Sequence, residues 1–332
     1  MLFKNMLFGF LSLTLLGLLG FVVYTQENPE WKPYQRQYYR LLAEKMGDPK
    51  LASTPPKLVQ TWLPDLSRTD RCTNCHMGIA NPAFADQPQP FKSHPFLDGY
   101  MKSHPLEKYG CTVCHDGDGQ ATVVEKTHGI VHHLDRQLAT GIMVQSACVR
   151  CHADMHEPGV EYPEAPAIMW GKQFVTQTAF MKCGACHAVK QYGWTAVLAP
   201  ELSGIGSRTE LSFYLVHEFQ HMESKTHTKA QWEFEHFKDP QKITPGKKQV
   251  NKETGQEEWV GRTIMPNFVA IHKLTDEQTL MLTAWVMSLR DSKIEKIPMA
   301  YTPPRRKPVL AGAEPLKPAG NAGPAPAAKR KT

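Results

Sequence analysis

The stretch Cys72-Thr73-Asn74-Cys75-His76 is the first of four copies of a Cys-x-x-Cys-His pattern in this chain of 332 residues. The other copies are Cys111-Thr112-Val113-Cys114-His115, Cys148-Val149-Arg150-Cys151-His152 and Cys183-Gly184-Ala185-Cys186-His187. Together they use all eight cysteines of the protein. The architecture of the chain therefore depends on what these four motifs bind.

The spacing of each motif is typical of covalent attachment of haem c. Two thiols three positions apart reach the two vinyl groups of one porphyrin, and the imidazole that follows then lies under the iron as its proximal ligand. The sequence thus predicts four covalently bound haem c groups. The predicted thioether positions are Cys72, Cys75, Cys111, Cys114, Cys148, Cys151, Cys183 and Cys186, and the predicted proximal ligands are His76, His115, His152 and His187.

Two other uses of paired cysteines explain the pattern less well. A zinc ribbon also uses Cys-x-x-Cys pairs, but the interval from Cys75 to Cys111 is long for a ribbon, and zinc requires no histidine after each pair. A disulfide framework would not require these histidines either. The chance that a histidine follows all four pairs by accident is negligible.

The amino-terminal segment predicts a membrane anchor. Met6 to Val23 is apolar and uncharged, follows Lys4, and is long enough to approach the span of a bilayer. The residues Val23-Tyr24-Thr25-Gln26 do not form a small-x-small cleavage site, which favours an uncleaved anchor over a removed signal peptide. Haem is attached outside the bacterial cytoplasmic membrane. We therefore expect a single anchor in that membrane, with the haem domains on its periplasmic side.

The segment after the anchor combines aromatic and basic residues, and two interpretations of it are compatible. A position at the membrane surface suits this composition, whereas helical spacing of apolar side chains is typical of an ordinary amphipathic helix. The first set is Trp31, Lys32, Tyr34, Arg36, Tyr38, Tyr39 and Arg40, and the second is Tyr34, Tyr38, Leu41 and Leu42.

The net charge of +6 arises from the carboxy-terminal end of the chain. Residues 302–332 hold seven basic residues and one acidic residue, Glu314, among many prolines, alanines and glycines. Such a composition cannot bury enough apolar surface to order itself, so a disordered tail is predicted. Because the basic residues lie in a tail and not on a folded face, nucleic acid is not an expected partner. Attachment of the tail to anionic lipid or to an acidic protein is the alternative to a solvated tail.

The predicted fold class is mostly α with much irregular structure. The first three motifs are separated by about thirty residues each, too few for separate helical domains, so the haems themselves must form much of the core. We expect short helices and loops around the porphyrins. The predicted parts are an anchor at 1–25, a juxtamembrane helix and linker at 26–70, a trihaem module at 71–160, an all-α domain at 161–292 and a Pro/Ala-rich basic tail at 293–332.

The domain at 161–292 resembles class I cytochrome c over residues 162–291. A helix-compatible stretch from Trp170 runs into Cys183, and a capping box of Thr275 and Gln278 begins an apolar helix that ends near Arg290. The resemblance implies that His187 is proximal, that Pro200 orients it, that Met265 is the distal ligand, and that the last helix packs across the first. A charged stretch near 217–260, centred on His217 to Lys252, departs from the family. It is interpreted as a surface insertion. Its four histidines, His217, His221, His227 and His236, could suggest a metal site, but His217 and His221, four residues apart, lack the third ligand of a metal motif.

The segment that holds the second motif is similar to a multihaem cytochrome module found beside membrane quinol-oxidising complexes of the cytochrome bc type. That similarity rests on His94-Pro95, His104-Pro105 and His128-Gly129, and it implies that His94, His104 and His128 are distal ligands, with no assignment to individual haems. Other residues remain candidates for these positions: His132, His133, His156, Met77, Met143 and Met155.

The predicted function is electron transfer and not catalysis, since an iron with two strong protein ligands has no site for substrate. His/Met ligation raises the potential relative to His/His, so electrons should run from the trihaem module to the haem at Cys183 and Cys186. The expected partners are a membrane cytochrome b-type quinol-oxidising subunit as donor and a soluble cytochrome c or terminal oxidase as acceptor. The competing hypotheses are a multihaem reductase of a small oxyanion with one five-coordinate haem, and a sensor or extracellular relay.

Overall fold

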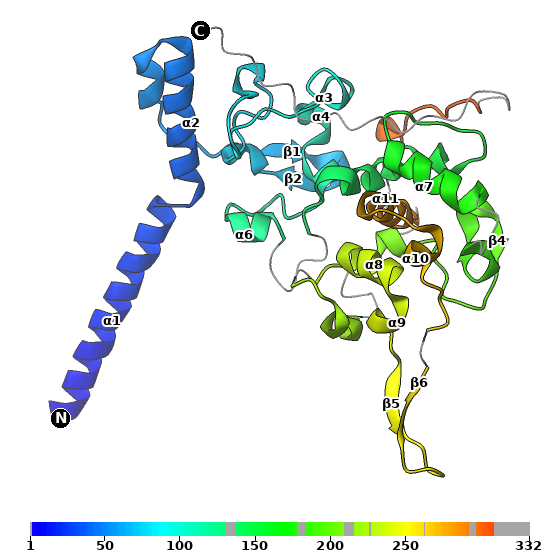
Figure 1. The fold of residues 1–332 in the computed structure, drawn as a ribbon. Helices are drawn as coiled ribbons and strands as arrows, with labels where there is room; N and C mark the ends of the chain where they lie inside the picture. Colours follow the sequence, from blue (N-terminus) through cyan, green and yellow to red (C-terminus); the bar gives the residue numbers. More distant parts are fainter. Residues whose placement is uncertain are drawn as a thin grey trace, which may run out of the picture. The chain divides into compact units, whose positions relative to one another are not determined.

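The structure is a computed structural model that describes residues 2–129, 137–177, 183–208, 216–225, 227–261, 263–291 and 297–308. The chain divides into two compact units, residues 1–138 and 139–332, each of which is described by itself. Helices make up close to half of the chain and much of the remainder is irregular, as Figure 1 shows. The coarse fold class predicted from the sequence is therefore confirmed. The third motif lies in the second unit, whereas the predicted boundary between haem modules fell after residue 160.

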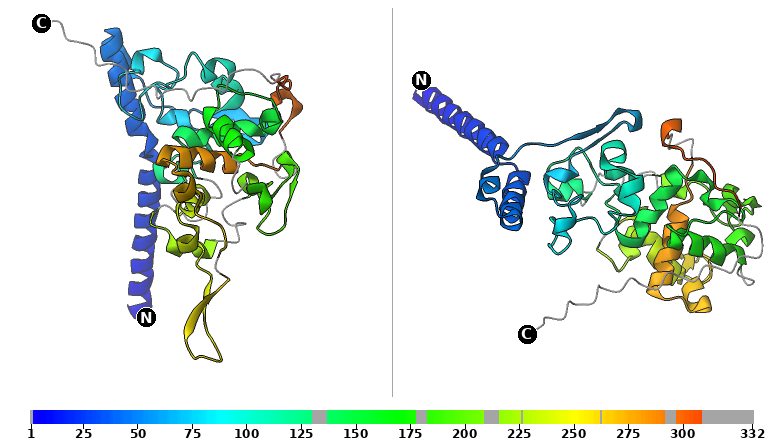
Figure 2. Two further views of the ribbon diagram at one scale, coloured as in Figure 1. Left: turned by 45° about the vertical axis from the view of Figure 1, so that its right-hand side comes forward. Right: turned by 90° about the horizontal axis from the view of Figure 1, so that it is seen from above.

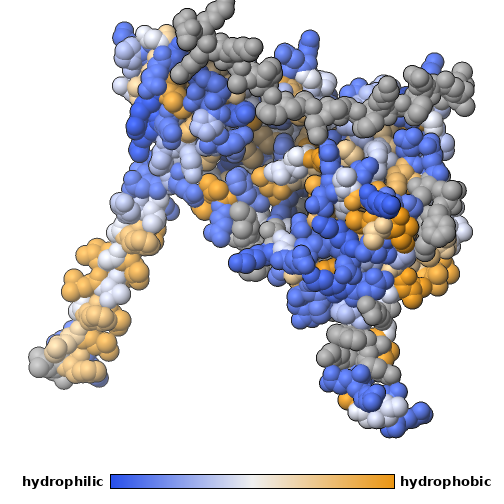
Figure 3. Space-filling model, in the orientation of Figure 1, coloured by the Kyte–Doolittle hydropathy of each residue, from blue (hydrophilic) through white to orange (hydrophobic). Residues whose placement is uncertain are grey.

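The first unit begins with a long apolar helix, α1, at Leu2–Glu27. Its 26 residues include an uncharged run. The exposed fractions of its large apolar side chains lie between 46% at Leu7 and 77% at Phe3. In Figure 3 this helix is lined by apolar residues. By length and composition α1 is able to cross a membrane, as the sequence predicted.

The helix α2, at Trp31–Met46, is amphipathic and packs on the first unit. Trp31, Gln35 and Tyr38 are buried, and the Tyr38 ring stacks on Phe84 with centroids 4.9 Å apart. The helix ends at Gly47, whose φ of 66° is readily adopted only by glycine. The helical spacing predicted for this segment is confirmed.

The rest of the first unit contains only short helices and strands, and much of its backbone is irregular. The strands β1 (Thr61–Leu63) and β2 (Arg68–Asp70) pair antiparallel, with Thr61 opposite Asp70. The short helices are η1 (Pro49–Ser53), η2 (Pro64–Leu66), η3 (Cys72–Asn74), η4 (Pro82–Phe84), α3 (Tyr100–Ser103), α4 (Leu106–Tyr109), α5 (Thr112–His115) and α6 (Val124–Thr127).

The second unit is built around two crossing helices, α7 (Pro166–Gln177) and α11 (Asp276–Met287), which lie side by side in Figures 1 and 2. Their close approach requires Gly171, because a Cβ there would lie 2.4 Å from the Trp285 Cβ. The predicted capping box is present at the start of α11, where Thr275 and Gln278 bond each other's backbone.

The remaining elements of the second unit are short, apart from α8. They include two antiparallel ribbons that the predicted all-α domain did not contain: β3 (Ala188–Val189) with β4 (Trp194–Thr195), and β5 (Lys247–Val250) with β6 (Glu257–Val260). The helices are η5 (Gly141–Arg150), η6 (Ala153–His156), η7 (Cys183–Ala185), η8 (Lys190–Tyr192), η9 (Ile205–Ser207), η10 (Val216–His221), α8 (Lys229–Lys238), α9 (Pro240–Ile243), α10 (Phe268–His272) and η11 (Met299–Tyr301).

The interpretation of residues 217–252 as a surface insertion is wrong for α8, which belongs to the core. Trp232 and Phe237 are buried in one apolar cluster with Leu282, Trp285 and Val286 of α11. The charge of this segment favoured an exposed position, but three of the four charged residues of α8 are buried with it: Lys229, Glu233 and Glu235. The Lys229 ammonium donates to the backbone carbonyl of Ile205 at 2.6 Å.

The prediction of a disordered tail is wrong for its first described residues, 297–308. The Arg306 guanidinium lies 3.9 Å from the Tyr162 ring centroid and pairs with Glu164, while the Arg306 backbone N–H donates to Asp154. Arg305 pairs with Glu157. The carboxylates of Asp154, Glu157 and Glu164 thus hold residues 305 and 306 against the second unit, although the composition of the tail predicted disorder. Residues 309–332 lie outside the described part of the chain.

Candidate haem-attachment sites

All four Cys-x-x-Cys-His motifs adopt the same single helical turn. In each, the second cysteine N–H donates to the first cysteine carbonyl at 3.1–3.2 Å, and the histidine N–H donates to the same carbonyl at 2.8–3.0 Å. Residues three and four apart lie on one face of such a turn, so each turn presents two thiols and an imidazole together. No disulfide joins the eight cysteines, all of which are within the described residues.

The first motif is fixed by the side chain between its cysteines. Asn74 is 1% exposed and donates to the carbonyls of Val59 and Arg71, while its own carbonyl accepts from the Val59 N–H and from Gln35 of α2. Every polar atom of this buried amide is thus satisfied, which holds the turn against α2 and the chain that follows it.

The second motif is fixed by a buried carboxylate, Asp70, at the end of β2. Asp70 is 2% exposed and accepts hydrogen bonds from the backbone N–H groups of Cys111 and Thr112 and from the Thr112 hydroxyl. The N–H of Arg71, next to Cys72, donates to the carbonyl of Gly119, shortly after the second motif. The first two motifs therefore lie side by side.

Two of the thiols, those of Cys75 and Cys183, do not resemble the reactive thiol of a redox-active Cys-x-x-Cys. Burial raises the pKa of Cys75 to about 11, and burial likewise raises the pKa of Cys183 to about 11. Reactive thiols of that class have a lowered pKa, which supplies the thiolate at neutral pH. These two cysteines remain protonated, so thiol–disulfide chemistry is a poor explanation for them.

The structure brings two of the predicted distal histidines to two of the proximal ones. The His128 ring lies opposite His76, and the His94 ring lies opposite His115, each pair with ring centroids 6.3 Å apart. The interplanar angles are 45° and 80°. This pairing of distal with proximal residues was left open by the sequence.

The 6.3 Å separation fits a metal ion between the rings of each pair. A metal bond to an imidazole nitrogen is about 2.0 Å long and the ring centre lies about 1.1 Å behind that nitrogen, so rings on opposite sides of one ion have centres about 6 Å apart. The donor sets of these two sites, two imidazoles and two nearby thiols each, therefore suit haem c with His/His ligation.

One of the predicted proximal rings is held by a proline carbonyl. His187 Nδ1 lies 2.7 Å from the Pro200 carbonyl, to which it donates. Burial, and after it the neighbouring His128, lowers the pKa of His76. A carbonyl at Nδ1 fixes the ring tautomer and leaves Nε2 as the metal-binding atom. The role implied for Pro200 by the class I resemblance is consistent with this contact.

The tautomers of the distal candidates differ. The Phe96 N–H donates to His94 Nδ1 at 3.2 Å, so ligation through Nε2 requires this ring to move its proton to Nδ1 and to give up that bond. His104 instead has Nδ1 at 3.1 Å from the Tyr100 carbonyl, which leaves Nε2 as an acceptor. The His104 ring contacts Tyr109, and the structure places it in neither of the two histidine pairs.

The third motif lies against a tyrosine. His152 Nδ1 is 3.3 Å from the Tyr162 hydroxyl, which donates to Asp154 at 2.7 Å. Among the alternative distal candidates, Met143 packs with Cys148 at the edge of a buried cluster that includes Met155. Met77 packs instead with Tyr38 and Phe84 in the first unit, and His132 and His133 lie outside the described residues.

His156, another alternative distal candidate, has both ring nitrogens in hydrogen-bond contacts and is 2% exposed. Its Nδ1 lies 2.8 Å from the Tyr192 hydroxyl, and its Nε2 lies 3.1 Å from Ser288 Oγ. Trp285 Nε1 donates to the same tyrosine at 2.9 Å. His156 thus joins η6 to η8 and to the end of α11, which is a structural role.

The burial of His156 predicts that the second unit loses stability in acid. Desolvation lowers its pKa to about 4, with Lys172 contributing, against 6.5 for the exposed ring. Between pH 6.5 and pH 4 the unfolded chain binds a proton on His156 that the folded chain does not bind. The free energy of unfolding is therefore highest above pH 6.5 and decreases by about 3 kcal/mol as the pH falls toward 4. Urea unfolding at a series of pH values, followed by circular dichroism, measures the free energy of unfolding. In His156→Gln this free energy should depend less on pH. An equally steep loss in that variant would exclude His156 as the cause.

The predicted residues of the fourth site gather at the apolar cluster of α8 and α11. Cys183 and Met265 both pack on it, and Trp194 lies against Gly184 of the motif. His236, considered in the sequence only as one histidine of the charged stretch, also lies here, with its Nε2 3.0 Å from Met265 Sδ. Its position four residues after Trp232 on one helix face is the signal that was available.

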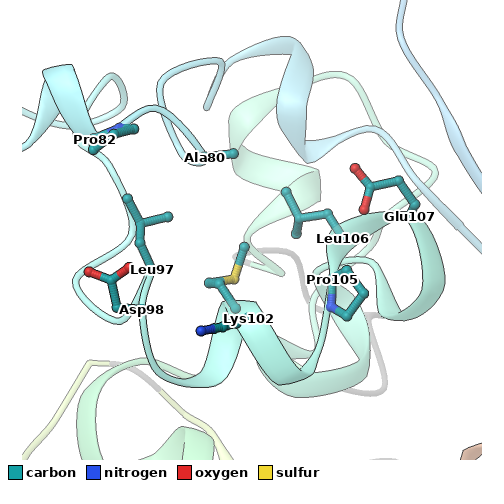
Figure 4. Close-up of a pocket in the computed structure, with 9 residues that line it drawn as sticks. Ala80, Pro82, Leu97, Asp98, Lys102, Pro105, Leu106 and Glu107 are labelled. Carbon is teal, nitrogen blue, oxygen red and sulfur yellow. The ribbon is translucent and has the colours of Figure 1, made fainter.

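An open cavity of about 460 Å³ in the first unit is lined by residues that lie between the first and second motifs in the sequence. In Figure 4, Leu97 and Leu106 point into it from opposite sides, with the charged residues Asp98, Lys102 and Glu107 around them. Of the motif cysteines and histidines, all of which the structure describes, none lines this cavity, so it is not a haem-attachment site.

Comparison of the chain with protein-family models, with curated proteins and with solved structures finds no match.

Proposed function

We propose that this protein is a membrane-anchored tetrahaem c-type cytochrome that passes electrons from a quinol-oxidising membrane complex to a soluble cytochrome c or a terminal oxidase. The observation that carries the proposal is the fourfold repetition of one turn, which places two thiols and an imidazole on the same face at every motif. Haem, when bound there, supplies the reversible one-electron chemistry.

The histidine pairs support electron transfer over catalysis. His76 with His128, and His115 with His94, provide two imidazoles for each of two irons. An iron ligated on both sides has no position for substrate, so these sites accept and release electrons only. Asp70, two residues before Cys72, accepts from the N–H groups of Cys111 and Thr112 and so brings these two sites together, which favours rapid exchange between them.

The fourth site supports a role as the exit. Met265 supplies a thioether ligand, which raises the potential relative to two histidines and makes this haem the thermodynamic end of the path. Apolar side chains on both sides of the site are exposed: Val197 at 93%, Leu198 at 63% and Ile264 at 72%. Exposed apolar residues around a redox centre suit transient docking of a soluble acceptor.

The apolar helix α1 supports the membrane assignment, with the haem units on the periplasmic side of a bacterial cytoplasmic membrane. A cytochrome b-type quinol-oxidising subunit is the donor of the right class, since quinol is confined to the bilayer and its oxidation delivers electrons at the membrane surface. Nucleic acid has no part in this proposal.

A potentiometric titration with electron paramagnetic resonance at each poise tests the proposal. The expected result is four low-spin haems, one of them at clearly higher potential, and reduction of the protein by quinol in native membranes. Fewer than four haems per chain would overturn the cofactor assignment. A persistent high-spin ferric haem that binds cyanide would instead favour a reductase of a small oxyanion.

A further inference from the structure

The fourth site contains one more iron-binding side chain than a haem requires. His187 and Met265 are the two ligands implied by the class I resemblance, yet His236 Nε2 lies 3.0 Å from the Met265 sulfur. An imidazole nitrogen and a thioether sulfur this close together are able to reach the same metal position. Both are ligands that haem iron accepts opposite a histidine.

His236 is held by a regular helix and by the core. It lies in α8, is 9% exposed, and stacks on Trp232 with ring centroids 4.4 Å apart and planes 13° apart. Its Nδ1 lies 3.3 Å from the Thr244 hydroxyl. The hydrogen bond to Met265 Sδ is donated by Nε2–H, because a thioether only accepts. Moving the proton to Nδ1, which then donates to the Thr244 hydroxyl, frees the Nε2 lone pair and gives the tautomer that binds a metal.

Met265 is held differently, by backbone contacts in the irregular segment between β6 and α10. Its carbonyl accepts from Gln241 Nε2 at 2.6 Å, and its N–H donates to the Thr263 hydroxyl at 3.1 Å. The neighbouring Ile264 side chain is largely exposed. The sulfur therefore comes from a loop at the surface and the imidazole from a buried helix, so one is able to move without the other.

We propose that His236 is a second distal ligand for the iron bound at His187, so that the fourth haem is ligated by His187 with either Met265 or His236. This inference rests on the proposed function, because it requires haem at Cys183 and Cys186. The exchange breaks one iron–sulfur bond, forms one iron–nitrogen bond and leaves the oxidation state unchanged. The imidazole lowers the potential of the haem relative to the thioether, so the exchange would set whether this haem ends the electron path.

The test compares Met265→Ala with the double variant Met265→Ala/His236→Gln. In the single variant the fourth haem is expected to stay low-spin in the ferric state, to resist carbon monoxide in the ferrous state, and to titrate at a lower potential than in the wild type. In the double variant the same haem is expected to become high-spin and to bind carbon monoxide. The sulfur-to-iron charge-transfer band, present in the wild type, should be absent from both.

The matched control is Met265→Ala/His272→Gln, which removes another histidine near the same core and should stay low-spin. A high-spin fourth haem in Met265→Ala alone would overturn the inference and would leave His236 as a hydrogen-bond donor to the sulfur. A haem count of three in the wild type, with no spectral change in Met265→Ala, would instead overturn the proposed function at this motif. His236→Gln alone shows whether the site still folds, because it should keep the charge-transfer band.

Discussion

Replacing His128 with alanine is expected to convert one low-spin haem, the one attached at Cys72 and Cys75, to a high-spin haem that binds carbon monoxide when reduced. The reason is the position of the His128 ring opposite His76, at a centroid distance of 6.3 Å. His94→Ala should do the same to the haem at Cys111 and Cys114, because His94 lies opposite His115. Electron paramagnetic resonance of the ferric proteins measures the number of high-spin irons.

The assignment of each histidine to one haem is tested in a background without the first haem. In Cys72→Ser/Cys75→Ser, which should carry three haems, adding His128→Ala is expected to create no high-spin iron, whereas adding His94→Ala should create one. The reverse result would exchange the two assignments. An unchanged spectrum for His128→Ala in the otherwise native chain would remove this residue from the ligand set.

Replacing Asp70 with alanine is expected to lower the free energy of unfolding of the first unit by about 3 kcal/mol and to reduce the haem count from four to three. The change leaves the N–H groups of Cys111 and Thr112 and the Thr112 hydroxyl without their acceptor in a buried position. The turn that presents the second pair of thiols then loses its attachment to β2. Urea unfolding and the alkaline pyridine haemochrome spectrum measure the two effects.

Asp65→Asn is the control for this prediction, because Asp65 is exposed on the same part of the chain and its replacement should change stability by less than about 0.5 kcal/mol. Asp70→Asn keeps the side-chain volume but places an amide against three donors. Its loss in free energy of unfolding should therefore lie between those of Asp70→Ala and Asp65→Asn. If Asp70→Ala unfolds at the urea concentration of the wild type, the carboxylate does not hold the motif.

The sequence predicted those features that depend on neighbouring residues. The apolar run of α1 and the capping box of Thr275 and Gln278 are local, and the structure has both helical elements where they were expected. The contact of His187 with Pro200 was implied by resemblance and spans only 13 residues. Short-range patterns of this kind do not depend on how the remainder of the chain folds.

Long-range features were not predictable, and buried charge was the main source of error. The partner of His76 lies far along the chain at His128, and no spacing rule selects it over His94. The charge of the stretch that contains α8 indicated a surface insertion, yet the Lys229 ammonium is buried, where it donates to the Ile205 carbonyl. Arg306 similarly finds Tyr162 and Glu164, which composition cannot show.

The short connection between α1 and α2 limits how far the first haem sites can travel from a bilayer that holds α1. Three residues, Asn28 to Glu30, join the helices, and the Lys32 ammonium reaches back to the Glu27 carbonyl at 2.6 Å. Three residues extend to about 10 Å at most. Encounter with a partner in the same bilayer thus becomes a two-dimensional search, whose rate depends on how densely the two proteins populate that membrane.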